Sequence, residues 1–279
     1  MTARQVAKWA GQTAAGLRRR WKRQSVYLFG KVGSTNDEAK RLAEEEAPSG
    51  TIVLGREQTG GRGRERRAWY SPPDAGVYLS MVFRPTRVKN PLLLPVLAGL
   101  GVVHNLDTSF QGLSPGLKWP NDIYAGDRKC GGILAEAAWS DGAPRYLIVG
   151  VGINVKPLSD ALPAEVLAHA TSLEEQLGEV VDPVRVADAI VTGLEMRLSD
   201  PAAYLDAKAL DLVDHYDWLR DRRISLLPDG SEVPTTGVSV GIAPDGALLF
   251  RPDRGALRRV QRGTVVPERA ALAKESGEA

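Results

Sequence analysis

Cysteine, histidine and long apolar runs are scarce in this 279-residue chain. One cysteine, Cys130, cannot form a disulfide within the chain, and His104, His169 and His215 are not paired at the spacing of zinc ligands. The most apolar stretch, Leu92 to Val103, contains a proline and is shorter than the roughly 20 residues that cross a bilayer. We therefore expect a cytoplasmic protein without a disulfide framework, a zinc site or a membrane span.

The charges that are present are unevenly placed. The formal net charge is +2, yet residues 1–24 hold seven basic side chains and no acidic one, so the rest of the chain carries −5. This leader also contains Trp9, Leu17 and Trp21, and it is compatible with contact to nucleic acid or an anionic membrane, or with a transit segment. We favour a solvated helical arm or linker over 1–24, because charge runs are usually solvated faces.

The hydrophobic pattern predicts a globular α+β protein, in keeping with 43% hydrophobic and 25% charged residues. Thr35 and Glu38 have the spacing of a capping box, and Asp182-Pro183 is typical of a helix start. A proline-interrupted, mobile loop is expected after Lys156. Strands are expected at 26–32, 51–57 and 77–84 and, as an antiparallel meander, at 117–124, 132–139 and 146–155, and helices from Thr35, at 91–106, from Pro183 and at 201–216.

The pattern of apolar and turn-forming residues changes after residue 223. Short apolar runs alternate there with Pro-Asp-Gly at 228–230 and 244–246 and Asp-Arg-Gly at 253–255. Strand spacing this short favours a small β-barrel. We therefore divide the chain into the arm 1–24, a catalytic domain 25–216, and a barrel with its tail, 217–279.

One loop, Gln58 to Trp69, has a composition suited to an anion. It interleaves three glycines with four arginines between two predicted strands. Glycines let backbone N–H groups approach a phosphate or carboxylate, and arginine forks add charge-assisted bonds. The loop has neither the Gly-Lys-Ser/Thr of a Walker motif nor a following helix as in a dinucleotide fingerprint. A disordered linker and a nucleic-acid-binding segment remain as alternatives.

Two further segments break the rules of the strands that contain them. Lys118-Trp119-Pro120-Asn121-Asp122 places a proline and paired polar residues in a predicted strand, and such violations often mark a site. Lysine would supply a point charge, and Asp122 is a suitable oxygen ligand for Mg²⁺. Gly150-Val151-Gly152-Ile153-Asn154 ends another strand. The alternatives are an edge strand for the first segment and a tight strand end for the second.

Together these motifs resemble those of biotin protein ligases. Ser34-Thr35-Asn36, the 58–69 loop, 118–122, Gly131 to Glu136 and 150–154 occur in the family's order. The resemblance covers about 26–155, and the predicted barrel extends it to about 270. It implies a mixed sheet with helices, similar to class II aminoacyl-tRNA synthetases and the biotin–lipoate ligase catalytic domain, followed by an SH3-like barrel.

The resemblance also implies a reaction. Biotin's carboxylate would attack the α-phosphate of MgATP to give biotinyl-5′-AMP, and a lysine of the biotin carboxyl carrier domain of acetyl-CoA carboxylase would take the biotinyl group. Cys130 needs no role. The implied residues are Lys118, Arg64 and Asp122 for catalysis; Ser34, Thr35, Asn36, Gln58, Arg62, Gly63, Arg64 and Lys118 for biotin; Arg62, Arg64, Trp69, Lys118, Asn121 and Asn154 for the nucleotide; and Asp122 and Glu136 for Mg²⁺.

The chain departs from the family pattern at three places. Arg66 stands where the loop usually has glycine and Ala68 where it usually has a basic residue, which puts retention of the adenylate in doubt. The short leader does not fit the DNA-binding domain of the longer relatives, so we expect a monofunctional ligase without specific DNA binding.

A lipoate or octanoate ligase and a nucleic-acid-binding regulator remain alternatives, and a homodimer is compatible with the resemblance. We also expect the Gly/Arg loop and the segment after Lys156 to order on binding.

Overall fold

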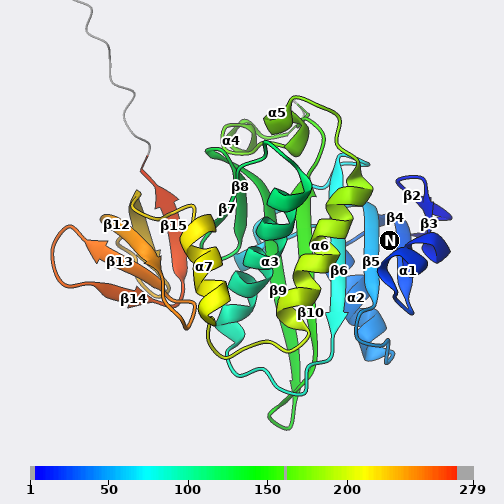
Figure 1. The fold of residues 1–279 in the computed structure, drawn as a ribbon, viewed down its shortest axis with the longest axis horizontal. Helices are drawn as coiled ribbons and strands as arrows, with labels where there is room; N and C mark the ends of the chain where they lie inside the picture. The colour runs from blue at the N-terminus through cyan, green and yellow to red at the C-terminus, as the bar shows by residue number, and fades with distance from the viewer. Residues whose placement is uncertain (1–3, 160–161, 269–279) are drawn as a thin grey trace, which may run out of the picture.

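A mixed eight-stranded sheet forms the centre of the molecule (Figure 1). The computed structural model describes residues 4–159 and 162–268. Strands β4 and β5 are parallel, and every other neighbouring pair in this sheet is antiparallel. The α+β class expected from the sequence is confirmed. In sheet order the strands are β1 (Arg4–Gln5), β4 (Val26–Val32), β5 (Ile52–Gln58), β6 (Gly76–Phe83), β10 (Ala143–Asn154), β9 (Arg128–Ser140), β8 (Asp122–Ala125) and β7 (Pro115–Lys118).

The parallel pair brings two candidate site segments together. Val32, at the end of β4, lies opposite Gln58, at the end of β5. The chain that leaves β4 enters α2 (Thr35–Glu44), and the chain that leaves β5 enters the Gly/Arg loop. Carboxyl ends of parallel strands meet at one edge, so these two loops are neighbours. The β4 bounds predicted from the sequence are confirmed, and those of β5 and β6 differ by one residue.

Helices cover both faces of the sheet. On one face α3 (Leu94–Ser109, preceded by a 3-10 turn, Pro91–Leu93) packs against α6 (Pro183–Leu198), as Figure 1 shows. Their backbones touch: a Cβ added to Gly101 would stand 2.2 Å from the carbonyl oxygen of Gly193. Helix α2 packs on other strand residues in a separate apolar cluster. By length and composition Pro91–Ser109 could cross a membrane, but 61% of that stretch is buried inside the fold, as in a core helix.

The structure corrects three predicted elements. The strand expected at 117–124 is a hairpin, because a turn with a cis Trp119–Pro120 peptide separates β7 from β8. The predicted capping box of Thr35 is absent: Ser34 is the N-cap, and the Thr35 hydroxyl bonds elsewhere. The helix expected from residue 201 begins only at Ala207 (α7, Ala207–Tyr216), where Asp206 caps it. The local sequence pattern predicted whether each segment is a strand or a helix. It did not reveal the polar side chains whose hydrogen bonds set where these elements begin.

The segment after Lys156 contains more structure than predicted. It forms α4 (Ala164–Leu167) and α5 (Leu173–Leu177), with residues 160 and 161 outside the described part. A full capping box between Ser172 and Glu175 begins α5. The backbone of Lys129 in β9 bonds to both His169 and Thr171, which ties this segment to the sheet. Ordering of the segment on binding remains a prediction.

The basic leader is packed rather than solvated. Its described residues form β1, β2 (Lys8–Trp9), β3 (Gln12–Thr13) and α1 (Ala14–Trp21), and β1 pairs with the edge of β4. Trp9, Leu17 and Trp21 are buried in the main core. The Trp21 indole donates to Asp188 of α6 at 2.8 Å, and Arg20 bonds the same carboxylate. The prediction of a solvated arm was wrong, because its apolar positions face the core while the basic ones face outward.

The C-terminal strands form a separate open sheet. The five strands are antiparallel, and β14 and β15 end the order without pairing with each other. A closed barrel, as predicted, is therefore not formed by the described residues. The indole of Trp119 donates to Gly246 O at 2.9 Å, which fastens this sheet to the β7–β8 turn. Its strands are β11 (Arg223–Pro228), β12 (Thr235–Ile242), β13 (Leu248–Pro252), β14 (Arg258–Val260) and β15 (Gly263–Pro267).

Candidate functional site

Two adjoining cavities hold nearly all of the predicted site residues. The larger, about 1040 Å³, lies among the β4–α2 junction, the Gly/Arg loop, the β7–β8 hairpin, β9, β10 and β15. The smaller, about 190 Å³, shares Trp69 and Lys129 with it and includes Asn154. Glu136 lines neither. The larger cavity contains Ser34, Thr35, Asn36, Gln58, Arg62, Gly63, Arg64, Trp69, Lys118, Asn121 and Asp122.

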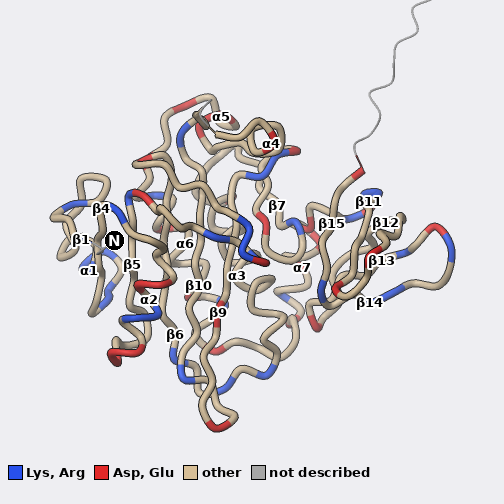
Figure 2. The backbone as a smooth tube through the Cα atoms, turned by 180° about the vertical axis from the view of Figure 1, so that it is seen from behind, with Lys and Arg blue, Asp and Glu red and all other residues tan. Residues whose placement is uncertain are grey.

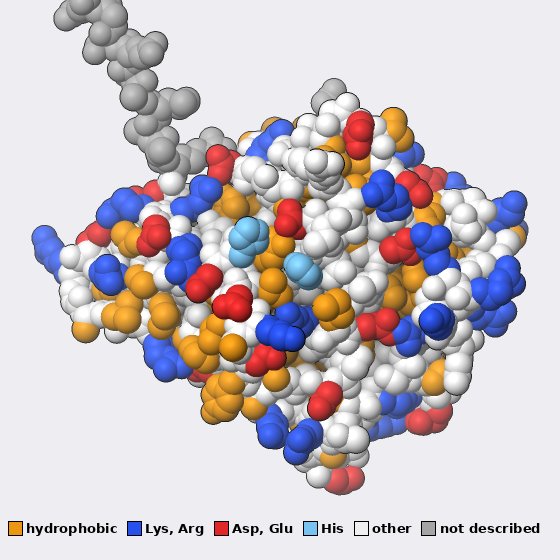
Figure 3. Space-filling view, in the orientation of Figure 1, with side chains coloured by type: hydrophobic (Ala, Val, Ile, Leu, Met, Phe, Trp, Pro, Cys, Tyr) orange, Lys and Arg blue, Asp and Glu red, His pale blue; other side chains and the backbone are white. Residues whose placement is uncertain are grey.

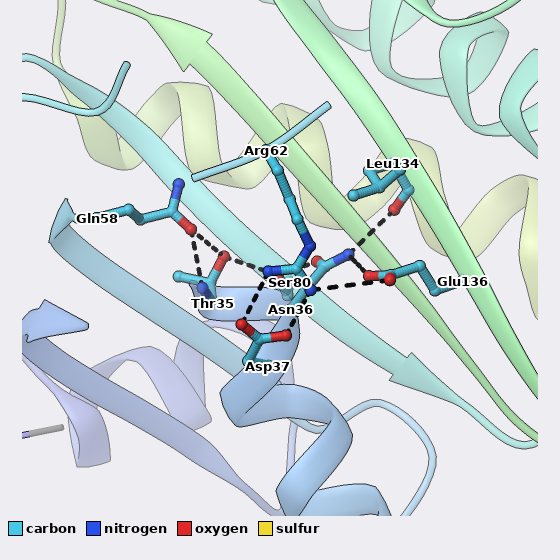
Figure 4. Close-up of polar contacts among 8 residues, drawn as sticks. All are labelled: Thr35, Asn36, Asp37, Gln58, Arg62, Ser80, Leu134 and Glu136. Carbon is cyan, nitrogen blue, oxygen red and sulfur yellow. Dashed lines mark hydrogen bonds and ion pairs between the residues drawn. The ribbon is translucent and has the colours of Figure 1, made fainter. Parts of the chain in front are cut away.

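A buried polar network forms one end of the larger cavity (Figure 4). Gln58 Oε1 accepts from the Thr35 backbone N–H at 2.8 Å and lies 3.1 Å from the Thr35 hydroxyl. The fully buried Ser80 hydroxyl lies 2.8 Å from Thr35 Oγ1 and 2.6 Å from Asn36 Oδ1. These three oxygen–oxygen contacts share only two hydroxyl protons, so one contact lacks a proton. The network can therefore accept a donor from a ligand.

Two charged residues, Glu136 of β9 and Arg62 of the Gly/Arg loop, hold the α2 end of this network in place. Asn36 Nδ2 donates to Glu136 Oε2 at 2.6 Å, which leaves Asn36 Oδ1 facing Ser80. Arg62 makes a two-pronged pair with Asp37, one arm at 2.8 Å, and lies 3.8 Å from Glu136. The hydrogen bond to Asp37 raises the pKa of Arg62. Figure 4 shows these side chains converging from α2, β9 and the loop.

A cluster of three charged residues, Lys118, Asp122 and Lys129, also lines the larger cavity. Lys118 is buried, with its ammonium 3.6 Å from Asp122 Oδ2. Lys129 lies 2.5 Å from the other oxygen, Asp122 Oδ1. Burial lowers the pKa of Lys118, the Asp122 charge opposes that shift, and the Lys129 charge adds to it. One carboxylate between two ammonium groups leaves this cluster with a net positive charge, which suits an anionic ligand.

The residues predicted to bind magnesium do not form one site. Asp122 lies opposite Gly132 in the β8–β9 ladder, and Glu136 stands four residues farther along β9, about 13 Å away by strand geometry. Asp122 is held by two lysines, and Glu136 by Asn36 and Arg62. In residues 4–159 and 162–268 no three potential metal ligands cluster. The structure thus separates the predicted pair, and its carboxylates do not fit a shared Mg²⁺.

The Gly/Arg loop is folded over the larger cavity. The Gly63 N–H donates to Arg67 O at 2.8 Å, and a 3-10 turn, Arg64–Arg66, lies between them. Arg67 reaches Glu65 at 3.1 Å and Thr264 of β15 at 3.4 Å. Arg64 lines the cavity, and its guanidinium forms no ion pair or hydrogen bond within the described residues, although its backbone carbonyl accepts from the Arg67 N–H at 3.1 Å. A guanidinium in this position can bind a phosphate.

Trp69 separates the two cavities. A Cβ added to Gly152 would stand 2.5 Å from Trp69 Nε1, so only glycine allows the indole this position. The buried Nε1 has no hydrogen-bond partner in the described part of the chain. Lys129 lies 5.5 Å from the ring centroid. The side-chain amides of Asn121 and Asn154 already donate to the main chain. Asn121 donates to Ile133 O at 2.8 Å, and Asn154 donates to Thr171 O at 3.0 Å.

Several residues of this region escaped the sequence reasoning. Ser80 sits inside an otherwise apolar strand, and nothing local distinguishes it from a core serine. Lys129 stands between the predicted motifs in an ordinary Arg-Lys pair. Tyr124 and Trp218 line the cavity with their rings 4.3 Å apart. Cys130, given no role, is fully buried, which raises the pKa of its thiol to about 12 and keeps it protonated.

Comparisons with known proteins agree with this site. Residues 29–154 match the model of the "Biotin/lipoate A/B protein ligase family". The chain is 37% identical over 170 residues, 61% of its length, to the bifunctional ligase/repressor BirA of Bacillus spizizenii. It spans about half (52%) of that relative's length. It is 32% identical to the biotin–[acetyl-CoA-carboxylase] ligase of Mycobacterium tuberculosis over 81% of this chain and 80% of that protein.

A solved structure extends the likeness to the whole fold. The biotin protein ligase from Aquifex aeolicus, in complex with biotin and ATP, superposes with a TM-score of 0.70 and 27% identity, covering 88% of this chain and all of that one. The chain therefore belongs to the biotin/lipoate A/B protein ligase family. Within that family, the relatives from Mycobacterium tuberculosis and Aquifex aeolicus are named as biotin ligases.

Proposed function

We propose that the chain is an ATP-dependent biotin protein ligase, which makes biotinyl-5′-AMP and transfers the biotinyl group to a lysine of a biotin carboxyl carrier domain. The observation that carries this proposal is that buried Lys118 lines the same cavity as the Thr35–Gln58 pair, which Ser80 supports. Through Asp122 it also neighbours Lys129, which lines the second cavity as well. The named relatives act on or bind the same substrates.

The polar network suits the ureido ring of biotin. Its acceptor oxygens outnumber its hydroxyl protons, so an N–H of the ureido group can donate to one of these oxygens. Arg62 and Glu136 hold Asn36 and the loop around it. The apolar valeryl chain would then extend toward Lys118. This arrangement favours biotin over lipoate or octanoate, which carry no ureido N–H groups for the network to bind.

The cationic cluster suits both chemical steps. In the first, a biotin carboxylate oxygen forms a bond to the α-phosphorus, the bond to the β-phosphate oxygen breaks, and pyrophosphate leaves. In the second, a lysine amine of the carrier attacks the acyl carbon, loses a proton, and AMP leaves. Lys118, fixed by Asp122, would stabilise the negative charge that develops in each step, and Arg64 would pair with phosphate. Magnesium would enter bound to the phosphates of ATP, and Asp122 remains the candidate carboxylate for it in the larger cavity.

The nucleotide would occupy the second region. Trp69, Tyr78 and Tyr124 surround the smaller cavity, and Asn154 gives it an amide. A small, mostly apolar cavity with several aromatic rings and one amide suits an adenine base. The covering Gly/Arg loop would exclude water from the hydrolysable adenylate. Asn121, which supports the hairpin by bonding Ile133, would act on the nucleotide only indirectly.

The test is transfer of biotin to a purified carrier domain of acetyl-CoA carboxylase, with MgATP, followed by streptavidin blot and intact mass. The wild type should label the carrier, and Lys118→Ala should lose at least a hundredfold in rate while keeping its circular dichroism. Lys31→Ala is the matched control, because Lys31 is a half-exposed lysine paired with Glu57 away from the cavities. Pyrophosphate release with lipoate or octanoate, but not biotin, would instead assign one of those acids.

We further propose that the enzyme is cytoplasmic and does not bind DNA specifically. In Figures 2 and 3 basic and acidic residues are interspersed, and neither view has a broad basic face of the kind a nucleic-acid binder presents. Retarded migration of duplex DNA at moderate salt would contradict this part of the proposal. A homodimer is the remaining expectation, and sedimentation with and without biotin and ATP tests it.

A further inference from the structure

Ser71 lies at the base of the Gly/Arg loop, where the two ends of the loop meet. Its side chain is 5% exposed and lines neither cavity. The residues beside it in the chain, Tyr70 and Pro72, line the smaller cavity, whereas Gln58 lines the larger one. Gln58 is the partner of Ser71 across the loop, and its backbone N–H donates to Ser71 O at 3.2 Å. Ser71 therefore joins a wall of one cavity to a wall of the other.

A chain of hydrogen bonds runs through the Ser71 hydroxyl. The Thr35 N–H donates to Gln58 Oε1, and Gln58 Nε2 donates to Ser71 Oγ, both at 2.8 Å. The Ser71 hydroxyl in turn donates to Trp69 O at 3.4 Å. All three donors point in the same direction along the chain, and bonds arranged in this way strengthen one another. The chain connects Thr35, in the region proposed for biotin, with Trp69, which borders both cavities.

Ser71 also determines which way the Gln58 amide faces. The hydroxyl has one proton, which goes to Trp69 O, so its oxygen accepts from Gln58. With an acceptor on one side and the Thr35 N–H on the other, only one orientation of the amide makes both bonds. Figure 4 shows that orientation, with the Gln58 oxygen toward Thr35 and the nitrogen turned away. Removing the hydroxyl takes away the bond that fixes the nitrogen end of the amide.

The atoms of this chain are tightly packed around Gly61. A Cβ added to Gly61 would stand 2.5 Å from Trp69 O and 3.0 Å from Ser71 Oγ. The same atom would stand 3.2 Å from Gln58 Nε2. The Trp69 N–H also donates to Gly61 O at 2.9 Å, which holds the base of the loop together. Because close-packed groups transmit displacements, a shift of Trp69 has to move Ser71 and Gln58 with it.

We propose that Ser71 is a positioning residue that makes the binding of one substrate depend on the other. Its hydroxyl holds Gln58 in the biotin region and Trp69 at the border of the nucleotide region. A ligand that orders either of these side chains therefore orders the other as well, through Ser71. The inference rests on the proposed function and assigns to it a residue that lies outside both cavities.

Calorimetry of biotin binding, with and without α,β-methylene-ATP, measures this dependence. The analogue cannot release pyrophosphate, so both ligands stay intact. It should tighten biotin binding about fivefold or more on the wild type, and less than about twofold on Ser71→Ala. By linkage, biotin should tighten the analogue by the same factors. The melting temperature and, with ATP, kcat should stay close to wild type, because Ser71 touches no reacting group.

Ser80→Ala is the matched control. Ser80 bonds Thr35 and Asn36, both on the biotin side, so its loss should weaken biotin but leave the tightening by the analogue at its wild-type size. A double-mutant cycle adds Gln58→Ala, which breaks the chain beside Ser71. In that background Ser71→Ala should not reduce the tightening further.

The inference is overturned if the analogue does not tighten biotin on the wild type, or tightens it equally on Ser71→Ala. An equal loss of tightening in Ser80→Ala, or a further loss in the double variant, would also overturn it, because the effect would then be a general one. A wild type that binds lipoate or octanoate instead of biotin would overturn the proposed function alone. The same measurements with that acid would then decide the role of Ser71.

Discussion

The indole nitrogen of Trp69 lies directly against the backbone of Gly152, where a Cβ would be 2.5 Å away. Gly152→Ala should therefore displace Trp69 from the boundary of the cavities. We expect the KM for ATP to rise at least tenfold, because the indole forms a wall of the smaller cavity. Gly142→Asn, in the open β9–β10 turn, is the control and should behave as wild type. An alanine variant with an unchanged KM would contradict this account of Trp69.

Ser80 should determine biotin affinity rather than nucleotide affinity. Ser80→Ala removes the donor that faces Asn36 Oδ1 in a buried site, which costs about 1–3 kcal/mol. The KM for biotin should rise roughly five- to tenfold, and the KM for ATP should stay constant. Ser140→Ala, at the exposed end of β9, should change neither. Equal changes in both constants would indicate a general loss of structure, which a thermal melt would reveal.

Arg66 holds an unfavourable backbone conformation in the Gly/Arg loop. Its φ is +59°, in the left-handed region, which costs a side-chain-bearing residue about 1–2 kcal/mol. Arg66→Gly removes that cost and should slow release of the adenylate about fivefold, equivalent to about 1 kcal/mol. Arg66→Ala removes the charge but keeps the Cβ, so its release rate should stay near wild type. Equal slowing by both variants would assign the effect to charge instead.

Asp217 should make the fold less stable as the pH rises. Burial raises its pKa to about 6, and within the described chain its Oδ2 has no partner. Between about pH 4, the ordinary carboxyl value, and pH 6, the folded protein holds a proton that the unfolded chain has lost. The free energy of unfolding should fall by about 1.4 kcal/mol per pH unit there. Asp217→Asn should abolish this slope.

The measurement for Asp217 is urea unfolding from pH 3.5 to 7.5 for both proteins. The gap between variant and wild type should grow by up to about 3 kcal/mol from the lower to the higher pH. The side chain accepts from the Leu219 N–H at 3.0 Å, a bond that asparagine can keep. Parallel stability curves would show that Asp217 titrates normally.

The packed leader has a measurable effect on stability. Leu17 is fully buried, so Leu17→Ala should lower the free energy of unfolding by about 2–5 kcal/mol. Arg19, two residues later on the exposed side of α1, provides the control, and Arg19→Ala should stay within about 0.5 kcal/mol. If both substitutions were silent in chemical denaturation, the leader would be the solvated arm that its charge suggests.

Local pattern predicted the elements whose cause is local. The apolar run Val26 to Val32 is β4, and Asp182 caps α6 by accepting from the Val184 N–H at 2.8 Å, as its position before Pro183 indicates. The family motifs predicted most residues of the larger cavity, because each motif has an unusual local composition. These features need no knowledge of distant partners.

Features that depend on distant partners were missed. Thr35 cannot cap α2 because Gln58 and Ser80 take its hydroxyl, and neither partner is near it in sequence. The leader's charges hid the burial of Leu17, since the pairing of β1 with β4 and the contact with α6 are long-range. The pairing of Asp122 with two lysines was also missed, because Lys129 comes next to Asp122 only when β8 and β9 pair in the folded sheet, whereas magnesium binding by Asp122 stays a prediction.

The contact between Arg67 and Thr264 joins positions 197 apart in the sequence and makes β15 a wall of the cavity. The C-terminal sheet is consequently not an interchangeable module. A chimera that joins residues 1–216 to the C-terminal part of another family member would set a foreign strand against this chain's own Gly/Arg loop. An exchange between relatives should preserve activity only when the loop and β15 are transferred together. The two segments therefore have to match each other although they lie far apart in the sequence.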